Sequence, residues 1–250
     1  MTNSEIPMNQ DVLTNLLHLS SPAIAIAFAD TPPAGVTRIA SAGPASCDYW
    51  RRAAEGETFY TVADDHKACP IGAHTHHVET SAEEQQELMG LIQNMVGLSY
   101  IRMEEVPSIP RRATPMRVAV YAPLADAPIV PDVVLVRGNA RQLMLLAEAA
   151  QLAGVAGVGP AMGRPTCAVL PAAINSQLTS VSFGCVGNRV HTGATANEAY
   201  VAIPGAHISA VVDSLRTILV ANDALEQFHR ERASAKDWHG PSLSSGAVTS

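Results

Sequence analysis

The chain has few aromatic and few charged residues. Among its 250 residues, aromatic side chains make up 4% and charged ones 16%, against a hydrophobic fraction of 47%. A disordered chain is instead rich in charge and poor in apolar residues, so this composition indicates an ordered globular protein. We expect alanine, valine and leucine to form most of a substantial core.

A basic surface, a long apolar run and a secretory leader are missing as well. The formal net charge of −7 argues against a general nucleic-acid-binding protein, which needs a basic surface. No apolar run reaches the length needed to cross a bilayer. The first residues, MTNSEIPMNQDVL, lack the basic start and apolar core of a secretory signal. The sequence therefore predicts a cytoplasmic protein that uses neither a membrane nor nucleic acid.

Apolar periodicity predicts a mixed α/β fold. Helices are expected over residues 11–19, 81–97, 139–154 and 207–233, and strands over residues 23–28, 116–122, 131–138 and 199–205. Ser81 and Glu84 form a capping box at the start of the second helix. Residues 38–78 show no sustained periodicity and are expected to be a partly irregular functional segment. Residues 154–195 are again glycine-rich and are expected to be irregular, while residues 236–250 are expected to be disordered.

Four cysteines lie in these irregular segments, at Cys47, Cys69, Cys167 and Cys185. No pair has the two-residue spacing of a zinc ribbon or a thioredoxin-type motif, so spacing alone is a weak signal. The plain alternative is four ordinary buried thiols, because free cysteine is among the most buried residue types. Each cysteine, however, stands beside glycine or proline and outside any apolar helix stripe, which favours a functional role. In a cytoplasmic protein that role is a thiol or a metal ligand, not a disulfide.

The surroundings of the cysteines recur along the chain. SAGPASCDYWRRAA around Cys47 matches AMGRPTCAVLPAA around Cys167, and CPIGAHT from Cys69 matches CVGNRVHT from Cys185. The paired cysteines are 22 residues apart in the first case and 18 in the second. We interpret this as an internal duplication, with a pseudo-twofold axis relating two α/β halves, residues 1–105 and 106–235, packed as one compact unit. Chance matches between alanine- and glycine-rich segments are the alternative.

Such an axis would bring four thiolates to one place. Four thiolates are the ligands of a [4Fe–4S] cluster and equally of a tetrahedral zinc ion. Glycines near the cysteines let backbone N–H groups approach the sulfur atoms. We therefore predict an iron–sulfur cluster held by all four cysteines, with zinc as the alternative.

Three further side chains are candidates for chemistry. His74 and His191 occupy matching places in the repeated pattern and are predicted to lie beside the metal ligands, or to replace one of them. In the stretch HKACPIGAHTHH, His76 and His77 are secondary, since neighbouring side chains point apart. Arg189 is a candidate for holding an anionic substrate through a bidentate contact, with a surface salt bridge as the plain alternative. No catalytic residue is assigned.

The order of several short motifs resembles a known family, domain-of-unknown-function family 169. The motifs are SPAIAIAF, SCDYWRRAAEGETFY, DDHKACPIGAH, APLADAPIVPDVVLV, RQLMLLAEAA, RPTCAVLPAA and FGCVGNRVHTG, and the resemblance covers most of the chain, about residues 13–219. The family pattern has cysteines at the positions of Cys47, Cys69, Cys167 and Cys185. The resemblance implies a shared cysteine site but no substrate.

Three functional hypotheses remain open. The first is an iron–sulfur protein that transfers electrons to a redox partner protein, or acts as an oxidoreductase or lyase on a small anionic substrate. The second is a non-enzymatic zinc or metal-sensing protein. The third is a thiol enzyme with one reactive cysteine and His74 or His191 as its base. In each case the apolar, alanine-rich helices leave room for a homodimer.

Overall fold

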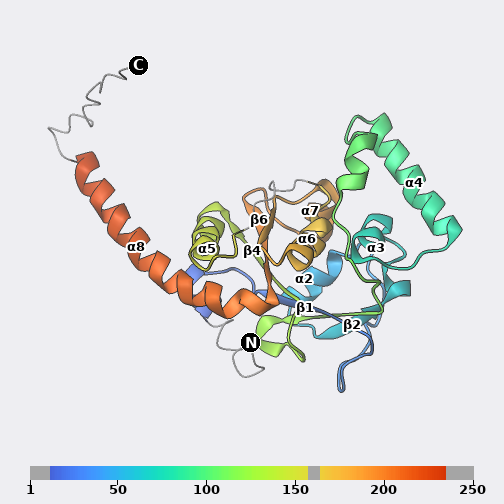
Figure 1. The fold of residues 1–250 in the computed structure, drawn as a ribbon, viewed down its shortest axis with the longest axis horizontal. Coiled ribbons are helices and arrows are strands. Elements are labelled where there is room, and N and C mark those ends of the chain that lie inside the picture. Colours follow the sequence, from blue (N-terminus) through green and yellow to red (C-terminus); the bar gives the residue numbers. More distant parts are fainter. Residues whose placement is uncertain (1–11, 157–163, 235–250) are drawn as a thin grey trace, which may run out of the picture.

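The computed structural model describes residues 12–156 and 164–234 and confirms a mixed α/β fold (Figure 1). Its centre is one sheet of six strands, in which every pairing is antiparallel. The strand order across the sheet is β2-β3-β1-β4-β6-β5. The strands are β1 (Ile24–Ala29), β2 (Phe59–Val62), β3 (Val118–Pro123), β4 (Val133–Asn139), β5 (Ser180–Ser182) and β6 (Glu198–Pro204).

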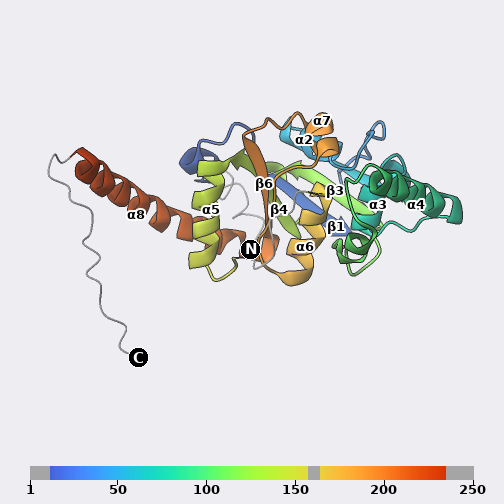
Figure 2. The same cartoon turned by 90° about the horizontal axis from the view of Figure 1, so that it is seen from above.

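Helices cover both faces of this sheet. The helices of the described residues are α2 (Asp48–Ala54), α3 (Pro70–His76), α4 (Ala82–Gly97), α5 (Ala140–Leu152), α6 (Val169–Ser176), α7 (Val186–Thr192) and α8 (Ile208–Ser234), and residues 12–17 are also helical. Short 3₁₀ turns lie between them: η1 (Ala63–His66), η2 (Met103–Ser108), η3 (Leu124–Asp126), η4 (Thr166–Ala168) and η5 (Gly205–His207). Figure 2 shows α5 and α8 on one side of β4 and β6, and α2, α6 and α7 on the other.

Alternation along the strands divides the core into two main layers. On β4, Val133 and Leu135 face one layer, while Val134 and Val136 face the other. The first layer packs against α2, α3 and α6 and contains the buried cysteines. The second packs against α5 and α8 and is purely aliphatic. Because side chains alternate with a period of two, a strand with both faces covered is apolar at every position.

The strand order is symmetric about the middle of the sheet. If β1 is matched with β4, β2 with β5 and β3 with β6, the order is the same when it is read from either edge. The chain also repeats the order cysteine, helix, strand, cysteine, helix, once from Cys47 to α3 and once from Cys167 to α7. This topology agrees with the predicted duplication, which stays a prediction. Under this matching the boundary between the halves falls between β3 and β4, after Pro123, and one sheet spans both halves.

The two segments without periodicity contain short regular elements between irregular stretches. Residues 38–78 contain α2, β2 and α3, and residues 154–195 contain α6, β5 and α7. The sequence did not predict these helices because they have seven or eight residues, about two turns, which is too short to display a period. Pro70 is the first residue of α3, where proline starts a helix without losing a hydrogen bond.

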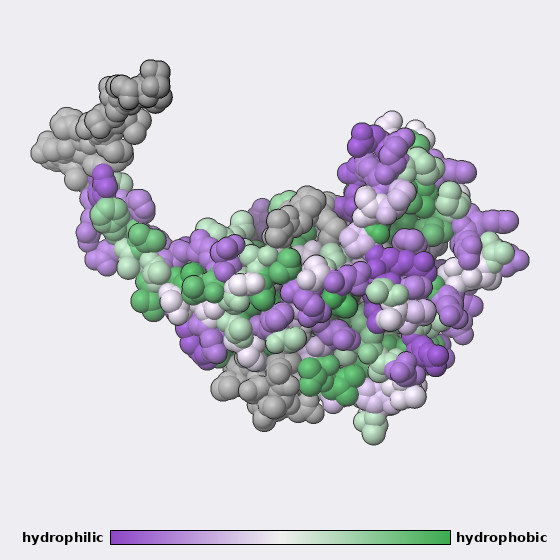
Figure 3. Space-filling view, viewed as in Figure 1, coloured by the Kyte–Doolittle hydropathy of each residue, from purple (hydrophilic) through white to green (hydrophobic). Residues whose placement is uncertain are grey.

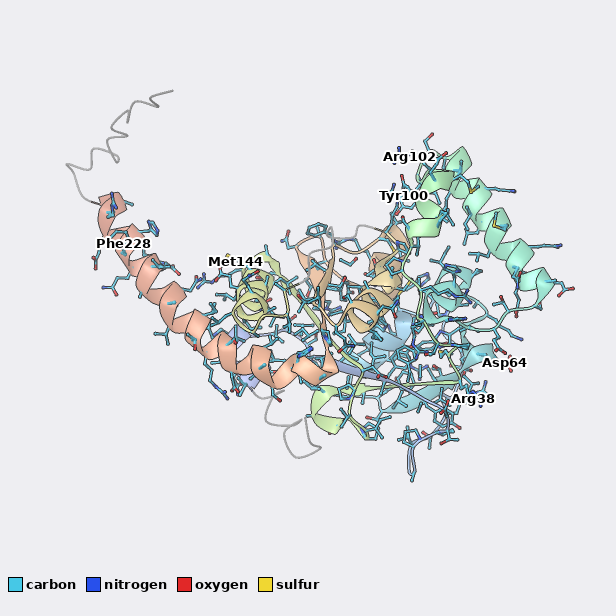
Figure 4. The ribbon with its side chains drawn as sticks, in the orientation of Figure 1. Arg38, Asp64, Tyr100, Arg102, Met144 and Phe228 are labelled. Atoms are coloured by element: carbon cyan, nitrogen blue, oxygen red, sulfur yellow. The ribbon has the colours of Figure 1, made fainter. Side chains whose placement is uncertain are left out.

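Two elements extend away from the body of the molecule, α4 with η2 on one side and the second half of α8 on the other (Figure 1). Both carry exposed apolar side chains. Figure 4 labels Phe228 near the far end of α8 and Tyr100 just after α4, and both are exposed. Met144, on α5 in the body of the molecule, is exposed as well. Green apolar residues are therefore interspersed with purple polar ones along both extensions in Figure 3.

The predicted long helices and their caps are confirmed. Ser81 Oγ accepts from the backbone N–H of Glu84 at 3.2 Å, and the Glu84 carboxylate accepts from the N–H of Ser81 at 2.8 Å. Asn139, the first residue of the predicted helix 139–154, caps α5. Within the described residues, none of the helices is both long enough and apolar enough to cross a membrane. The expected disordered tail, residues 236–250, lies outside the described part of the chain.

Candidate metal centre

All four cysteines stand at the beginning of a short helix. Cys47, Cys69 and Cys185 directly precede α2, α3 and α7. Cys167 lies in η4, which leads into α6. These helices cover one face of the sheet, so the fold gathers four segments from distant parts of the sequence above one layer of the core.

The thiols differ in exposure but not in redox state. Cys47 and Cys167 are buried, whereas Cys69 and Cys185 are partly accessible, and all four are free thiols. Cys69 packs against the layer that contains the two buried cysteines. The site therefore has two covered thiols and two that border solvent.

The four thiols are close enough to influence each other's ionisation. Burial, and then the nearby Cys69, raises the pKa of Cys47 to about 12, and Cys185 contributes further. Burial also raises the pKa of Cys167 well above its usual range, and Cys69, Cys185 and Cys47 each add to that rise. The structure thus brings the four predicted cysteines into one region.

The thiols are neighbours, but their arrangement in the described residues is not that of a metal-binding group. In the two described ranges, no group of three or more His, Cys, Asp or Glu side chains is already arranged to hold a metal ion.

Polar side chains stabilise two of the thiolates. Thr75 lies close enough to Cys167 to offset part of the rise in the pKa of that thiol. The Asn188 amide lies close enough to Cys47 to offset part of the rise in the pKa of that thiol. Asn188 is 1% exposed, yet neither its side-chain nitrogen nor its oxygen has a hydrogen-bond partner of ordinary geometry among the described residues. A buried amide without partners is costly, so a structural role alone explains Asn188 poorly.

The backbone at Gly72 fits closely against the site. A Cβ atom there would lie 2.1 Å from Ser46 Oγ and 2.9 Å from Cys69 Sγ, both closer than real Cβ contacts. Glycine is therefore required at this position for the first turn of α3 to approach Ser46 and Cys69. In the second half, the N–H of Cys185 donates to Thr166 Oγ1, next to Cys167.

A buried histidine pair joins the end of η1 to the end of α3. His66 is held between Ser46 Oγ, 2.8 Å from its Nδ1, and Thr61 Oγ1, 2.9 Å from its Nε2. His76 Nδ1 lies 2.8 Å from the carbonyl oxygen of Gly72, which can only accept, so Nδ1 carries the proton. Its Nε2 then accepts from the hydroxyl of Tyr121 at 3.3 Å.

Both rings are neutral at physiological pH. Burial lowers the pKa of His76 to about 4. Burial, and then the neighbouring His76, lowers the pKa of His66 well below its usual value. The ring centroids are 5.0 Å apart, so a charge on one ring would disfavour a charge on the other. The pair is a fixed polar support for the segment that carries Ser46 and Cys69.

The three predicted accessory residues lie in different settings. His74 is half-buried on the outer face of α3, and burial, followed by the nearby Arg111, lowers its pKa. His191, in the last turn of α7, has no hydrogen bond or ion pair with the described residues that would orient it towards a thiol. Neither histidine is in hydrogen-bond contact with a cysteine within the described ranges.

Arg189 serves a structural purpose. Its guanidinium donates to the backbone carbonyls of Phe183 and Thr195 and, at 3.1 Å, to that of Glu198. These carbonyls engage three of the five N–H donors of the guanidinium, which disfavours the predicted substrate contact. Arg189 instead ties α7 to the strands on either side of it, and so fixes the loop that carries Cys185.

Sequence reasoning missed the side chains around the thiols. Ser46, His66 and Asn188 are single polar residues in glycine-rich stretches, where no periodic pattern sets them apart. The pattern of the duplication contained one usable signal: Ser46 and Thr166 directly precede the matched cysteines Cys47 and Cys167. Ser46 Oγ lies against the backbone of Gly72, near Cys69, and Thr166 Oγ1 accepts from the backbone N–H of Cys185.

The fold and the gathered thiols define a mixed α/β protein with a four-cysteine site on one face of its sheet. The model of domain-of-unknown-function family 169, described as an uncharacterised ArCR family, matches residues 12–214. Because the match covers most of the chain, the protein belongs to this family. Searches of curated proteins and of solved structures found no match to the chain.

Proposed function

We propose that the protein is a cytoplasmic metalloprotein that binds an iron–sulfur cluster of the [4Fe–4S] type. Its ligands would be Cys47, Cys69, Cys167 and Cys185. One observation carries the proposal: thiols from four separate segments lie near enough to raise the pKa of Cys47 and Cys167.

The electrostatics favour a bound cation. Four thiolates in one partly buried region repel one another, and burial adds a desolvation cost to each. A metal cation removes both penalties, because coordinating thiols are deprotonated outright. The gathered thiols are thus unfavourable as free thiolates and favourable as metal ligands.

The surrounding residues fit such a group. The Asn188 amide has an unused N–H₂ group beside Cys47, and amide donors stabilise ligating sulfur. At Gly72 the backbone of α3 lies so close to Ser46 and Cys69 that a residue with a Cβ atom does not fit there. When bound, the cluster would supply one-electron transfer or Lewis-acid chemistry. The chain's own residues would hold the sulfur atoms, orient them and limit the access of water.

The activity we propose is electron transfer with a redox partner protein, or oxidoreductase or lyase chemistry on a small anionic substrate. The partly accessible Cys69 and Cys185 support either role, since a cluster edge near solvent is needed for electrons or substrate to reach it. The exposed apolar residues of α4 and α8 are compatible with a homodimer.

The same four thiols would also bind zinc as a structural or sensing site, and metal content separates the two cases. The thiol-enzyme alternative is less well supported. A catalytic cysteine needs a base within hydrogen-bond reach, whereas neither His74 nor His191, the two predicted bases, has a hydrogen bond to a cysteine among the described residues.

The experiment is anaerobic purification followed by iron, sulfide and zinc analysis and visible absorption. A brown protein that contains iron and sulfide supports the cluster. A colourless protein that contains zinc supports the alternative site. Protein free of all three after anaerobic reconstitution, with one thiol that alkylates rapidly, would favour the thiol enzyme.

A further inference from the structure

A cavity of about 340 Å³ lies between α3 and α4. The two helices are neighbours in both views (Figures 1 and 2). The volume is in the range of sites that hold small organic molecules. Two of its lining residues, Lys67 and Pro70, are close in sequence to Cys69 on either side, so the cavity borders the cysteine site.

One cation in the cavity wall is available to a ligand. Lys67 already pairs with Asp64 at 2.9 Å and with Glu84 at 3.5 Å. The guanidinium of Arg111, by contrast, has no ion pair among the described residues, although it lines the same cavity. Arginine binds a planar carboxylate through two parallel hydrogen bonds, which makes Arg111 the natural anchor for an anion.

His74 adds a neutral hydrogen-bonding group beside this anchor. It lines the cavity, and both its burial and the charge of Arg111 lower its pKa. A neutral imidazole can donate to or accept from a ligand oxygen without adding a second positive charge. Apolar side chains also line the cavity, among them Ala73 and Pro70 from α3 and Leu88 from α4.

The acidic side of the wall limits the charge of the ligand. Glu84 and Glu87 line the cavity, and Glu84 is already engaged by Ser81 and Lys67. Two carboxylates near a single unpaired guanidinium oppose a dianion such as phosphate, but they tolerate a monoanion.

We propose that this cavity binds a small organic monocarboxylate with an apolar body, whose carboxylate is held by Arg111 and His74 and whose body lies against Leu88 and Ala73. The claim that this ligand is the substrate rests on the proposed cluster function. The binding itself does not, because none of the four cysteines lines the cavity. Arg111 therefore takes the place of Arg189 as the residue that contacts the anionic substrate.

The test is calorimetric titration of the metal-free, full-length protein with hexanoate and 3-phenylpropanoate. Matched probes are the corresponding primary amides, which lack the charge, and inorganic phosphate. We expect the two carboxylates to bind at least about tenfold more tightly than their amides and than phosphate. Preferred binding of phosphate, equal binding of the amides, or no carboxylate binding would overturn the proposal.

Variants locate the site. Arg111→Gln and His74→Gln are expected to weaken carboxylate binding, Arg111→Gln by about tenfold or more. Arg117→Gln is the matched control, because Arg117 is exposed, lies outside the cavity and pairs loosely with Asp30 at 3.8 Å. Equal affinity in Arg111→Gln and wild type would refute the assignment. Iron analysis of the same variants keeps the two proposals separate, since neither substitution should change metal content.

Discussion

The side-chain amide of Asn188 lies against the thiol of Cys47, and among the described residues it has no hydrogen bond of ordinary geometry. A residue from α7 thus supports a cysteine at the start of α2, and helices from the two predicted halves meet at the site. An unused donor beside a neutral thiol becomes useful when that sulfur is a negatively charged ligand.

Replacement of Asn188 by leucine should therefore separate stability from metal chemistry. The metal-free Asn188→Leu variant is expected to unfold at the same urea concentration as wild type or a higher one, because an unpartnered buried amide is removed. In iron-loaded protein, loss of the donor should lower the reduction potential, because hydrogen bonds to sulfur stabilise the reduced state. Anaerobic redox titration measures this. Asn94→Leu, on the exposed side of α4, is the control, and identical potentials in all three proteins would contradict the role.

Two glycines that the duplication pairs should respond differently to alanine. Gly72→Ala introduces a Cβ 2.1 Å from Ser46 Oγ and is expected to cost about 1–3 kcal/mol and to reduce metal content. At Gly187 a Cβ meets nothing within 4 Å, so Gly187→Ala should be neutral or slightly stabilising. Urea unfolding and metal analysis of both variants check this. Comparable losses in the two would show that the close approach at Gly72 is unimportant.

The thiols should alkylate in a definite order. In metal-free protein, iodoacetamide is expected to modify Cys69 and Cys185 before Cys47 and Cys167, since the latter pair is buried with raised pKa values. Mass spectrometry after timed quenching gives the order. Metal loading should protect all four thiols together. Protection of only one or two would mean that the cysteines do not share a site.

Metal-free protein should lose stability in mild acid. The folded-state pKa of His76 is about 4, below its unfolded value near 6.5, so the unfolded state binds the proton more readily. The stabilisation is complete above pH 6.5 and is lost as the pH falls towards 4, by roughly 3 kcal/mol for this residue. His76→Gln should flatten the dependence, and His229→Gln, on the exposed surface of α8, should not. A flat profile in wild type would show that the ring is not held neutral.

Long elements could be predicted from the sequence and short ones could not. The capping box at Ser81 and the N-cap at Asn139 mark α4 and α5 because a helix of several turns shows both its cap and its apolar stripe. Helices such as α3 and α7 are too short for a stripe. Pro70 after Cys69 was the available signal for the start of α3, since proline is favoured at the first helical position.

The cysteines could be grouped from the sequence, but their surroundings could not. Recurring motifs joined Cys47 to Cys167 and Cys69 to Cys185 without any knowledge of the fold. The roles of Asn188, Gly72 and His66 depend on contacts between segments far apart in the chain, which no local pattern records. Arg189 looked available to an anion because the carbonyls that engage it come from three separate loop and strand positions.

The central claim is that four cysteines hold one iron–sulfur cluster. Its most direct test is iron and sulfide analysis of anaerobically reconstituted wild type beside the single variants Cys47→Ser, Cys69→Ser, Cys167→Ser and Cys185→Ser. We expect about four iron and about four sulfide ions per wild-type chain, and a marked loss of both in each variant. Wild-type protein that contains neither iron nor sulfide after reconstitution, or four variants with unchanged content, would contradict the claim.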